Sequence, residues 1–475
     1  MIAPHIASPT QPKEATTKVS FAWIAVSAFI VFLFDPGIMS NDSIASLQQA
    51  RSFEFNDWHP PLMAVIWSVL DRIISGSAGM LLAQAMLFAY ACSSLCAYAF
   101  PNLSARFPRW LVTVAFSLFP PVMTLTGMIW KDVWASTLLL LALAHLFRMR
   151  NSTTAEARFR QSLIVMLFCL AAIAFRHNAM AATAGLLAGA TYLQLSPHMA
   201  QWGRLLAAST IGVIIAFALF FCISFANSLI ATPAHPTTAI YLYDIAGIIV
   251  YSGDAENAAA LVLADPAEVT DEPEQFLNRI YSTYTPSAAG RVIRTSKKPH
   301  TPFSLRVDSL EHDAEGVQRI HRGLVKKYPI AYLKHRTQAF VCLLRLCNSK
   351  MWVYRSYVMN REFAFPETLN PESWQYAMRK VFLSPRLAPI YHPAFWLFIT
   401  LVGGAIGLVR VINPGPGAPS LLVFMGLSSV GLAFSLFFTS PIESFRYMHW
   451  TILVGWVMAG LAAETVAARP TPSPH

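Results

Sequence analysis

A short polar stretch directly after the first apolar run concentrates residue types that can do acid–base chemistry. Charged residues make up only 13% of the 475-residue chain, yet residues 35–62 hold four carboxylates and a histidine: Asp35, Asp42, Glu54, Asp57 and His59. A carboxylate at the edge of a membrane is costly unless it is solvated, paired or used chemically. We therefore interpret this stretch as a candidate active-site loop, in which a carboxylate orients or deprotonates a hydroxyl.

Further charged residues lie at the ends of other apolar runs: Lys131, Asp132, Arg176, His177 and Arg446. Each has an ordinary interpretation, such as an exposed ion pair worth under ~1 kcal/mol or a basic side chain that anchors a helix at the membrane surface. Asp42, in Asn41-Asp42-Ser43, also suits the cap of a short helix. An arginine fork, however, suits bidentate binding of phosphate.

The composition predicts a multi-pass membrane protein. Hydrophobic residues make up 55% of the chain, and the mean hydropathy is +0.47. A soluble domain is less apolar and about one-quarter charged. The net charge of +10 does not indicate nucleic-acid binding, because Lys and Arg flank apolar runs or lie in one long loop rather than forming a basic stripe with interleaved aromatics.

Ten apolar runs predict about ten transmembrane helices: 19–36, 79–99, 110–129, 134–147, 162–176, 179–195, 205–230, 393–411, 419–438 and 447–465. Residues 60–75 are continuously apolar for only about ten positions before Asp71, which favours an interfacial helix. With that assignment, eleven Lys and Arg of the short loops fall on the cytoplasmic side and five outside, as the positive-inside rule requires. Both termini are then cytoplasmic, and residues 21–34 form a retained anchor.

This topology places the candidate site residues on one face of the membrane. The chain divides into an N-terminal catalytic module (1–230, first outer loop 35–78), an extracytoplasmic segment (231–391) and C-terminal transmembrane helices (392–475). Within the middle segment, 240–251 and 328–357 are amphipathic enough to lie against the membrane. Four cysteines lie inside apolar runs, and Cys342 and Cys347 are poorly spaced to face one another on a helix. We therefore expect no disulfide and no zinc site.

The first polar stretch resembles a known loop. It reads, in order, Asn41-Asp42-Ser43, Gln48-Gln49-Ala50, Asn56-Asp57-Trp58 and His59-Pro60-Pro61-Leu62. This is similar to the first outer loop of the GT-C superfamily of glycosyltransferases that use polyprenyl-phosphate sugars, in particular the branch with the lipid A aminoarabinose transferase and the protein mannosyltransferases. That loop has an Asp-Glu pair, a Gly-Asp-Trp-like turn and a Lys- or His-Pro-Pro-Leu entry to the next helix. Ser43 replaces the usual Glu, and the resemblance covers residues 20–180.

The resemblance implies roles for individual residues. Asp42 takes the position of the superfamily's first-loop aspartate, Asp132 that of an acid in the second outer loop, and His59 that of a basic residue near the donor phosphate. Lys131, Arg176, His177 and Arg446 complete the expected substrate-binding set. Some members use a divalent metal ion, which Asp42 with Asp132 could hold through oxygen ligands.

The expected function is an integral membrane glycosyltransferase of the bacterial inner membrane whose site faces the periplasm or exterior. Its expected partners are a polyprenyl-phosphate sugar donor, membrane lipids and an envelope glycan, lipid or protein acceptor. The alternative is a transporter or flippase for lipid-linked saccharides. A transporter usually has several breaks at mid-membrane, whereas Pro120-Pro121 is the one clear break in this sequence.

Overall fold

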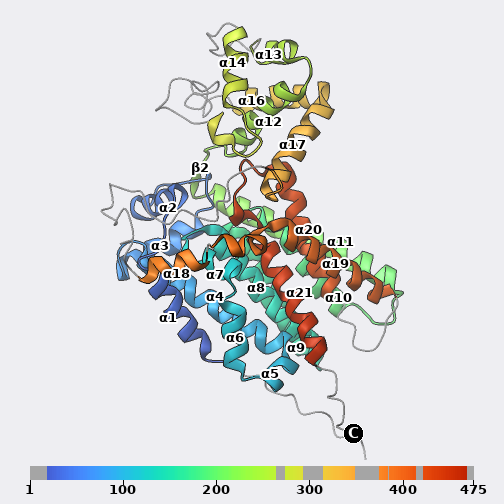
Figure 1. Ribbon diagram of the computed structural model, residues 1–475. Coiled ribbons are helices and arrows are strands. Elements are labelled where there is room, and N and C mark those ends of the chain that lie inside the picture. Colours follow the sequence, from blue (N-terminus) through green and yellow to red (C-terminus); the bar gives the residue numbers. More distant parts are fainter. Residues whose placement is uncertain are drawn as a thin grey trace, which may run out of the picture.

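The computed structural model describes residues 19–263, 273–292, 314–347, 374–382, 384–412 and 421–467, and helices joined by short turns dominate it. In this part of the chain the only strands are β1 (Phe55–Asn56) and β2 (Ala231–Thr232), which pair in parallel. The helices form a bundle and a smaller second group, which lies above the bundle in Figure 1. The expected all-α fold is confirmed.

The bundle has a helical segment at each of the ten apolar runs: α1 (Ala22–Phe34), α4 (Ala78–Ala99), α6 (Arg109–Ser117), α8 (Lys131–Arg150), α9 (Ala155–Phe175), α10 (Ala179–Gln194), α11 (Gln201–Ser228), α19 (Pro393–Ile412), α20 (Leu421–Thr439) and α21 (His449–Ala467). Among the described residues, six helices are long and apolar enough to cross a membrane, namely α4, α8, α9, α11, α19 and α20. The chain is therefore a membrane protein with several candidate spans.

Four of the ten helical segments are not among these six helices: α1, α6, α10 and α21. α10 has only 16 residues. α1 has 13 residues, which extend about 20 Å at 1.5 Å per residue, whereas a bilayer core is about 30 Å thick. The 110–129 run is broken near Pro120: α6 is followed by α7 (Pro120–Met123) and the 3₁₀ turn η1 (Thr124–Gly127), and the two parts are bent by 66°. The break at Pro120-Pro121 was expected from the sequence, but its angle was not. A seventh candidate span results if the bent pair counts as one.

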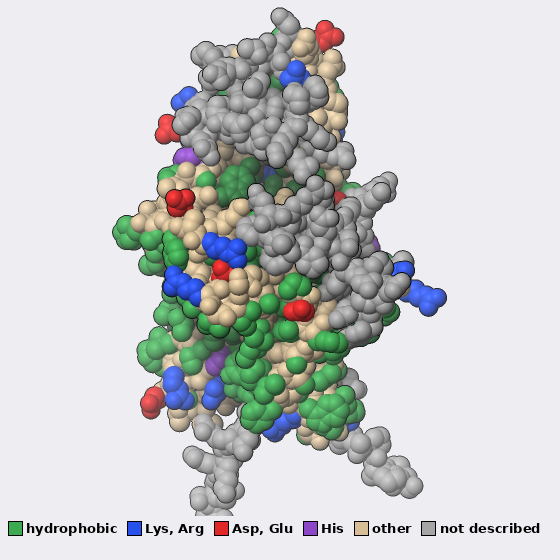
Figure 2. Space-filling model, turned by 90° about the vertical axis from the view of Figure 1, so that its left-hand side faces the viewer, with side chains coloured by type: hydrophobic (Ala, Val, Ile, Leu, Met, Phe, Trp, Pro, Cys, Tyr) green, Lys and Arg blue, Asp and Glu red, His purple; other side chains and the backbone are tan. Residues whose placement is uncertain are grey.

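The outside of the bundle is apolar. On the face shown in Figure 2, hydrophobic side chains gather over the bundle, and Lys and Arg side chains lie above them and near the lower end. Along α11, Ile214, Phe221 and Phe225 are each at least 60% exposed. An exposed apolar surface of this extent is expected where a protein meets lipid tails.

Small residues bring α10 and α20 into close contact. A Cβ added to Gly185 would lie 2.4 Å from the backbone nitrogen of Ser428, so a larger residue cannot fit there. The Ser428 hydroxyl donates to the carbonyl of Ala182 at 2.6 Å. Such close backbone approach is typical of helix packing in membranes. It places the start of α10 beside the end of α20, where the Asn178 amide donates to the Thr439 hydroxyl at 3.4 Å.

The first loop forms two short helices, α2 (Asn41–Ser52) and α3 (Leu62–Ile73). α3 is about 18 Å long at 1.5 Å per residue, which is too short to cross a bilayer. It buries Met63 and Trp67 against the bundle while Val69 and Ile73 are exposed. The short helix expected over 60–75 is therefore present.

The second group of helices has its own hydrophobic core, and we call it the second domain. It comprises α12 (Thr237–Tyr251), α13 (Ala255–Leu263), α14 (Pro273–Thr283), the turn η2 (Ala289–Arg291), α16 (Ala314–Lys327) and α17 (Pro329–Leu343). Leu242, Ile249, Phe276 and Leu324 are buried in this core. The expectation that 240–251 lies against the membrane is wrong, because its apolar side chains are used inside the domain. Positions 348–357 of the second expected membrane-lying helix are outside the described residues.

Part of the expected extracytoplasmic segment packs on the bundle instead. In α18 (Trp374–Phe382) and the turn η3 (Pro385–Tyr391), Met378, Phe382 and Tyr391 contact the bundle core. Among the described residues the second domain is therefore limited to 237–343, and the polypeptide returns to the bundle before α19.

Cys342 and Cys347 form a disulfide bond, so the expectation that these two residues do not pair is wrong. The expectation assumed one continuous helix. α17 instead ends at Leu343, and Arg345 has a positive φ of 61°, so the chain turns back on itself. This brings the two Cα atoms to 4.9 Å, within the range that a disulfide requires.

Candidate active site

The start of α2 leaves the Asp42 carboxylate free of any capping role. Ser40 is the N-cap, and its side chain exchanges hydrogen bonds with Ser43 in a capping box. The interpretation of Asp42 as the helix cap is therefore wrong. The Ser43 hydroxyl also donates to the carbonyl of Ile129 at 2.7 Å, which fixes α2 against the chain that leads into α8.

The chain before α8 is held tightly beside this helix. Ile38 and Met128 form a parallel β-bridge. The Gln84 amide donates to the carbonyls of Thr126 and Met128, both at 2.7 Å. At Gly127 an added Cβ would lie 2.1 Å from the ring of Phe34, so only glycine fits. These contacts place the first residues of α8, Lys131 and Asp132, next to Asp42.

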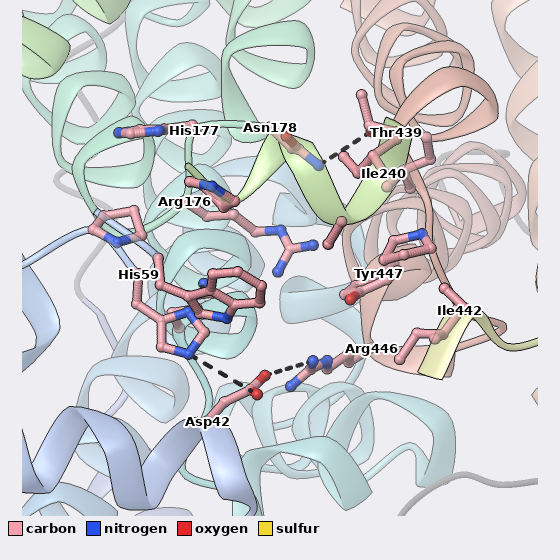
Figure 3. A pocket seen from close by; sticks show the side chains of 18 of the residues that line it. Asp42, His59, Arg176, His177, Asn178, Ile240, Thr439, Ile442, Arg446 and Tyr447 are labelled. Atoms are coloured by element: carbon pink, nitrogen blue, oxygen red, sulfur yellow. Dashed lines mark hydrogen bonds and ion pairs between the residues drawn. The ribbon is translucent and has the colours of Figure 1, made fainter. Parts of the chain in front are cut away.

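Four charged side chains from distant parts of the sequence form a continuous chain of ion pairs, which we call the charge chain: Arg176, Asp132, Arg446 and Asp42. Arg446 Nη2 lies 2.6 Å from Asp42 Oδ2, and its Nε lies 3.7 Å from Asp132 Oδ2. Arg176 pairs with the other oxygen of Asp132. Both candidate carboxylates therefore contact one guanidinium. Figure 3 shows Arg446 and His59 on either side of Asp42.

The two carboxylates have different surroundings. The Asp132 side chain is 3% exposed, whereas that of Asp42 is 33% exposed. Burial raises the pKa of Asp42, but the positive charges of Arg446 and Lys131 outweigh this effect and lower the pKa to about 2. Asp42 is therefore ionised at physiological pH and accessible, as a carboxylate that acts on a substrate must be.

His59 is neutral and hydrogen-bonded to Lys131. Burial, together with the charge of Lys131, lowers the pKa of His59 to about 3. Lys131 Nζ lies 2.5 Å from His59 Nδ1. When Lys131 is protonated, its ammonium group can only donate, so Nδ1 is then the accepting nitrogen and the proton of the neutral ring is on Nε2. Nε2 faces Asp42 Oδ1 at 3.9 Å, beyond direct hydrogen-bonding distance.

Aromatic rings support the two arginines. The Arg446 guanidinium lies 4.8 Å from the centre of the Trp130 ring, and the Arg176 guanidinium lies 4.5 Å from that of Tyr447. The Trp130 indole in turn donates to the Ser40 hydroxyl at 2.8 Å. No role of Trp130 or Tyr447 was expected from the sequence. Their positions directly beside Lys131 and Arg446 in the sequence were the available signal.

A cavity of about 600 Å³ opens between this cluster and the second domain. Its lining residues are Asp42, Asp57, Trp58, His59, Pro60, Lys131, Arg176, His177, Asn178, Pro236, Ala239, Ile240, Ala289, Gly290, Leu436, Thr439, Pro441, Ile442, Arg446 and Tyr447. Six of the seven candidate site residues are among them. Asp132 is the exception, since it contacts Arg176 and Arg446 rather than the cavity. The volume is in the range of sites for small molecules.

The residues present do not fit a divalent metal ion. Asp42 and Asp132 are paired with arginines, so a cation between them would face Arg446, Arg176 and Lys131. Within the described residues, one group of three potential ligands lies close enough together to hold a metal ion, and two of its members are the disulfide-bonded Cys342 and Cys347. The charges around Asp42 favour an anion instead.

Comparison of the chain with protein-family models, curated proteins and solved structures finds no match.

Proposed function

We propose that this chain is an integral membrane glycosyltransferase that moves a sugar from a polyprenyl-phosphate donor to an envelope glycan, lipid or protein acceptor. The observation that carries the proposal is the position of Asp42. It is an ionised, accessible carboxylate at a small-molecule-sized cavity whose wall also holds Arg446, Arg176 and Lys131. One base beside a cluster of basic side chains suits a transfer in which a hydroxyl attacks and a phosphate departs.

In the proposed reaction, the acceptor oxygen forms a bond to the sugar C1 while the bond from C1 to the phosphate oxygen breaks. The acceptor proton goes to Asp42, and the electron pair of the broken bond leaves with the polyprenyl phosphate. Arg446, Arg176 and Lys131 stabilise the negative charge that develops on this phosphate.

The ion pair between Arg446 and Asp42 suggests how donor binding and base strength are linked. A donor phosphate would compete with Asp42 for the Arg446 fork. The charge of Arg446 lowers the pKa of Asp42 more than any other group does. Its engagement with phosphate would therefore raise the basicity of the carboxylate. Asp42 would then become a better proton acceptor when the donor is in place.

We also propose a topology with ten spans, an interfacial α3 and both termini in the cytoplasm. The site then lies on the periplasmic or outer side of the bacterial inner membrane. The disulfide supports this side. Cys347 Sγ lies 3.9 Å from the carboxylate of Glu443, three residues before Arg446, so the disulfide and the site are at the same end of the bundle. Disulfides persist mainly in oxidising compartments.

The test is transfer by the purified protein in nanodiscs, with radiolabelled polyprenyl-phosphate sugars as donors. A glycolipid and surface-glycan comparison of a deletion strain with wild type first identifies the sugar and the acceptor. Asp42→Asn should abolish transfer. Glu54→Gln is the matched control, because it removes one carboxylate from an exposed position in the same loop and should leave transfer intact. Movement of the lipid-linked sugar across a liposome membrane without transfer would instead establish the transporter alternative.

A further inference from the structure

A fully buried arginine in the second domain contacts residues of its own domain and also a residue outside it. Arg336, in α17, is 0% exposed. Its Nε lies 2.7 Å from Asp244 Oδ1, and its Nη2 donates to Asp244 Oδ2 at 2.7 Å. Asp244 is 1% exposed and also contacts His321 and His335, at 3.0 and 3.1 Å. The charge of Arg336 is therefore paired with Asp244 inside the domain.

The remaining side of the Arg336 guanidinium reaches out of the domain. Its Nη1 donates to the carbonyl of Ser440 at 3.2 Å. Ser440 directly follows α20 and begins the 440–446 segment, which leads through the 3₁₀ turn η4 (Phe445–Met448) into α21. Arg336 therefore bonds at the same time to the centre of the second domain and to the segment that carries Arg446.

Residues 287–289 of the second domain hold the same segment through its backbone. The Ala289 N–H donates to the carbonyl of Pro441 at 2.8 Å, and the Glu443 N–H donates to the carbonyl of Ser287 at 2.9 Å. Ala288 and Ile442 form an antiparallel bridge. These two hydrogen bonds make up the bridge and attach the segment to the domain at Pro441 and Glu443, and the Arg336 contact adds a third position at Ser440.

We infer that Arg336, oriented by Asp244, is a positioning residue that sets the 440–446 segment and through it the place of Arg446 at the cavity. This inference rests on the proposed function for its effect on the donor phosphate. Its structural part, that Arg336 holds the segment in place, is independent of that function. Arg446 must meet Asp42 at one end of the bundle, yet the segment before it is held mainly by the second domain. A loss of the Arg336 contact should therefore displace Arg446.

The variant that tests this inference is Arg336→Lys. A lysine keeps the charge beside Asp244, but a single ammonium cannot make the bidentate contact with Asp244 and also reach the Ser440 carbonyl. The matched control is His321→Gln, which changes another partner of Asp244. The His321 ring contacts Asp244, Tyr241 and Tyr332, which all lie within the second domain. Both variants are made in the full chain and compared with wild type in nanodiscs.

The first readout is hydrogen–deuterium exchange of the peptide that covers 440–446, which reports local opening without any assumption about activity. We expect at least about tenfold faster exchange in Arg336→Lys and wild-type exchange in His321→Gln. The second readout is the donor KM. It should rise about tenfold in Arg336→Lys while the acceptor KM stays within twofold, because in the proposed mechanism Arg446 contacts the donor phosphate and not the acceptor.

Wild-type exchange in a folded Arg336→Lys protein overturns the inference, and so does faster exchange with an unchanged donor KM. A wild-type protein that neither binds nor transfers a polyprenyl-phosphate sugar refutes the proposed function instead, and the exchange result then decides the structural part alone. If Arg336→Lys does not fold, Ala289→Pro replaces it, since proline removes the one N–H that donates to Pro441 at the start of a 3₁₀ turn. The same exchange and KM results are required of it.

Discussion

Replacing Asp42 by asparagine should slow transfer without weakening donor binding, because the Asp42 carboxylate is paired with Arg446. Asparagine keeps the size of the side chain, and Ser40 and Ser43 rather than Asp42 cap α2. The lost pair with Arg446 is partly solvated, because the Asp42 side chain is 33% exposed, so its contribution to stability is about 1 kcal/mol or less. The variant should therefore fold, and a small shift in its thermal unfolding is the expected cost.

The effect on turnover should be much larger than the effect on stability. A positioned general base contributes about 10²- to 10⁴-fold, so kcat should fall at least about 100-fold. Donor affinity should not fall with it. Since the carboxylate no longer competes with phosphate for the Arg446 fork, the donor Kd should be equal to that of wild type or a few-fold tighter.

The assay is single-turnover transfer in nanodiscs together with equilibrium binding of the polyprenyl-phosphate sugar, on wild type, Asp42→Asn and Glu54→Gln. Turnover of Asp42→Asn within a few-fold of wild type would remove Asp42 from the mechanism. A donor Kd that weakens in parallel with the rate would show that Asp42 organises the binding site rather than accepting the proton.

Three further predictions concern the other groups of the site and its side of the membrane. Arg446→Lys should bind donor more weakly than wild type, and Arg446→Ala more weakly still, by ~2 kcal/mol or more, because the fork and then the charge are lost; equal donor Kd values would show that Arg446 is only scaffold. The stabilising effect of the Asp42 charge is present above about pH 4 and is lost as the pH falls toward its pKa of about 2, and His59, with a pKa of about 3, stays neutral. Neither group should titrate between pH 5 and 8, and an imidazole NMR signal that titrates in this range and is absent from His59→Gln would contradict this. A membrane-impermeant thiol reagent should label Gln48→Cys but not Ala155→Cys in intact cells, with the unsubstituted protein as control, and labelling of both would refute the topology.

The sequence was sufficient to bring the site residues together because each lies at a helix end. Asp42, Lys131, Arg176 and Arg446 flank apolar runs, and counting runs determines on which side of a membrane each falls. The structure places all four at one end of the bundle, in contact directly or through one neighbour. Counting apolar runs could not show which of the two carboxylates reaches the cavity. Asp132 is kept from it because both Arg446 and Arg176 pair with its side chain.

The features that sequence reasoning missed depend on long-range contacts or on local chain reversal. Asp244 lies within an apolar stretch, and its burial is possible because Arg336, 92 positions further on, places two guanidinium nitrogens 2.7 Å from its carboxylate oxygens. The Cys342–Cys347 disulfide depends on the end of α17 and on the left-handed conformation of Arg345. No periodicity of apolar residues reports either feature.

The charge chain also has a consequence for how the protein is made. Asp42 leaves the ribosome roughly 400 residues before Arg446, which at about 5–20 residues per second is about 20–80 s. During that interval the carboxylate has His59 and Lys131 nearby but not its closest cation. The closure of the site is therefore a late event of biosynthesis, completed when α21 joins the bundle. A nascent chain that has not yet reached residue 446 lacks the cation closest to Asp42.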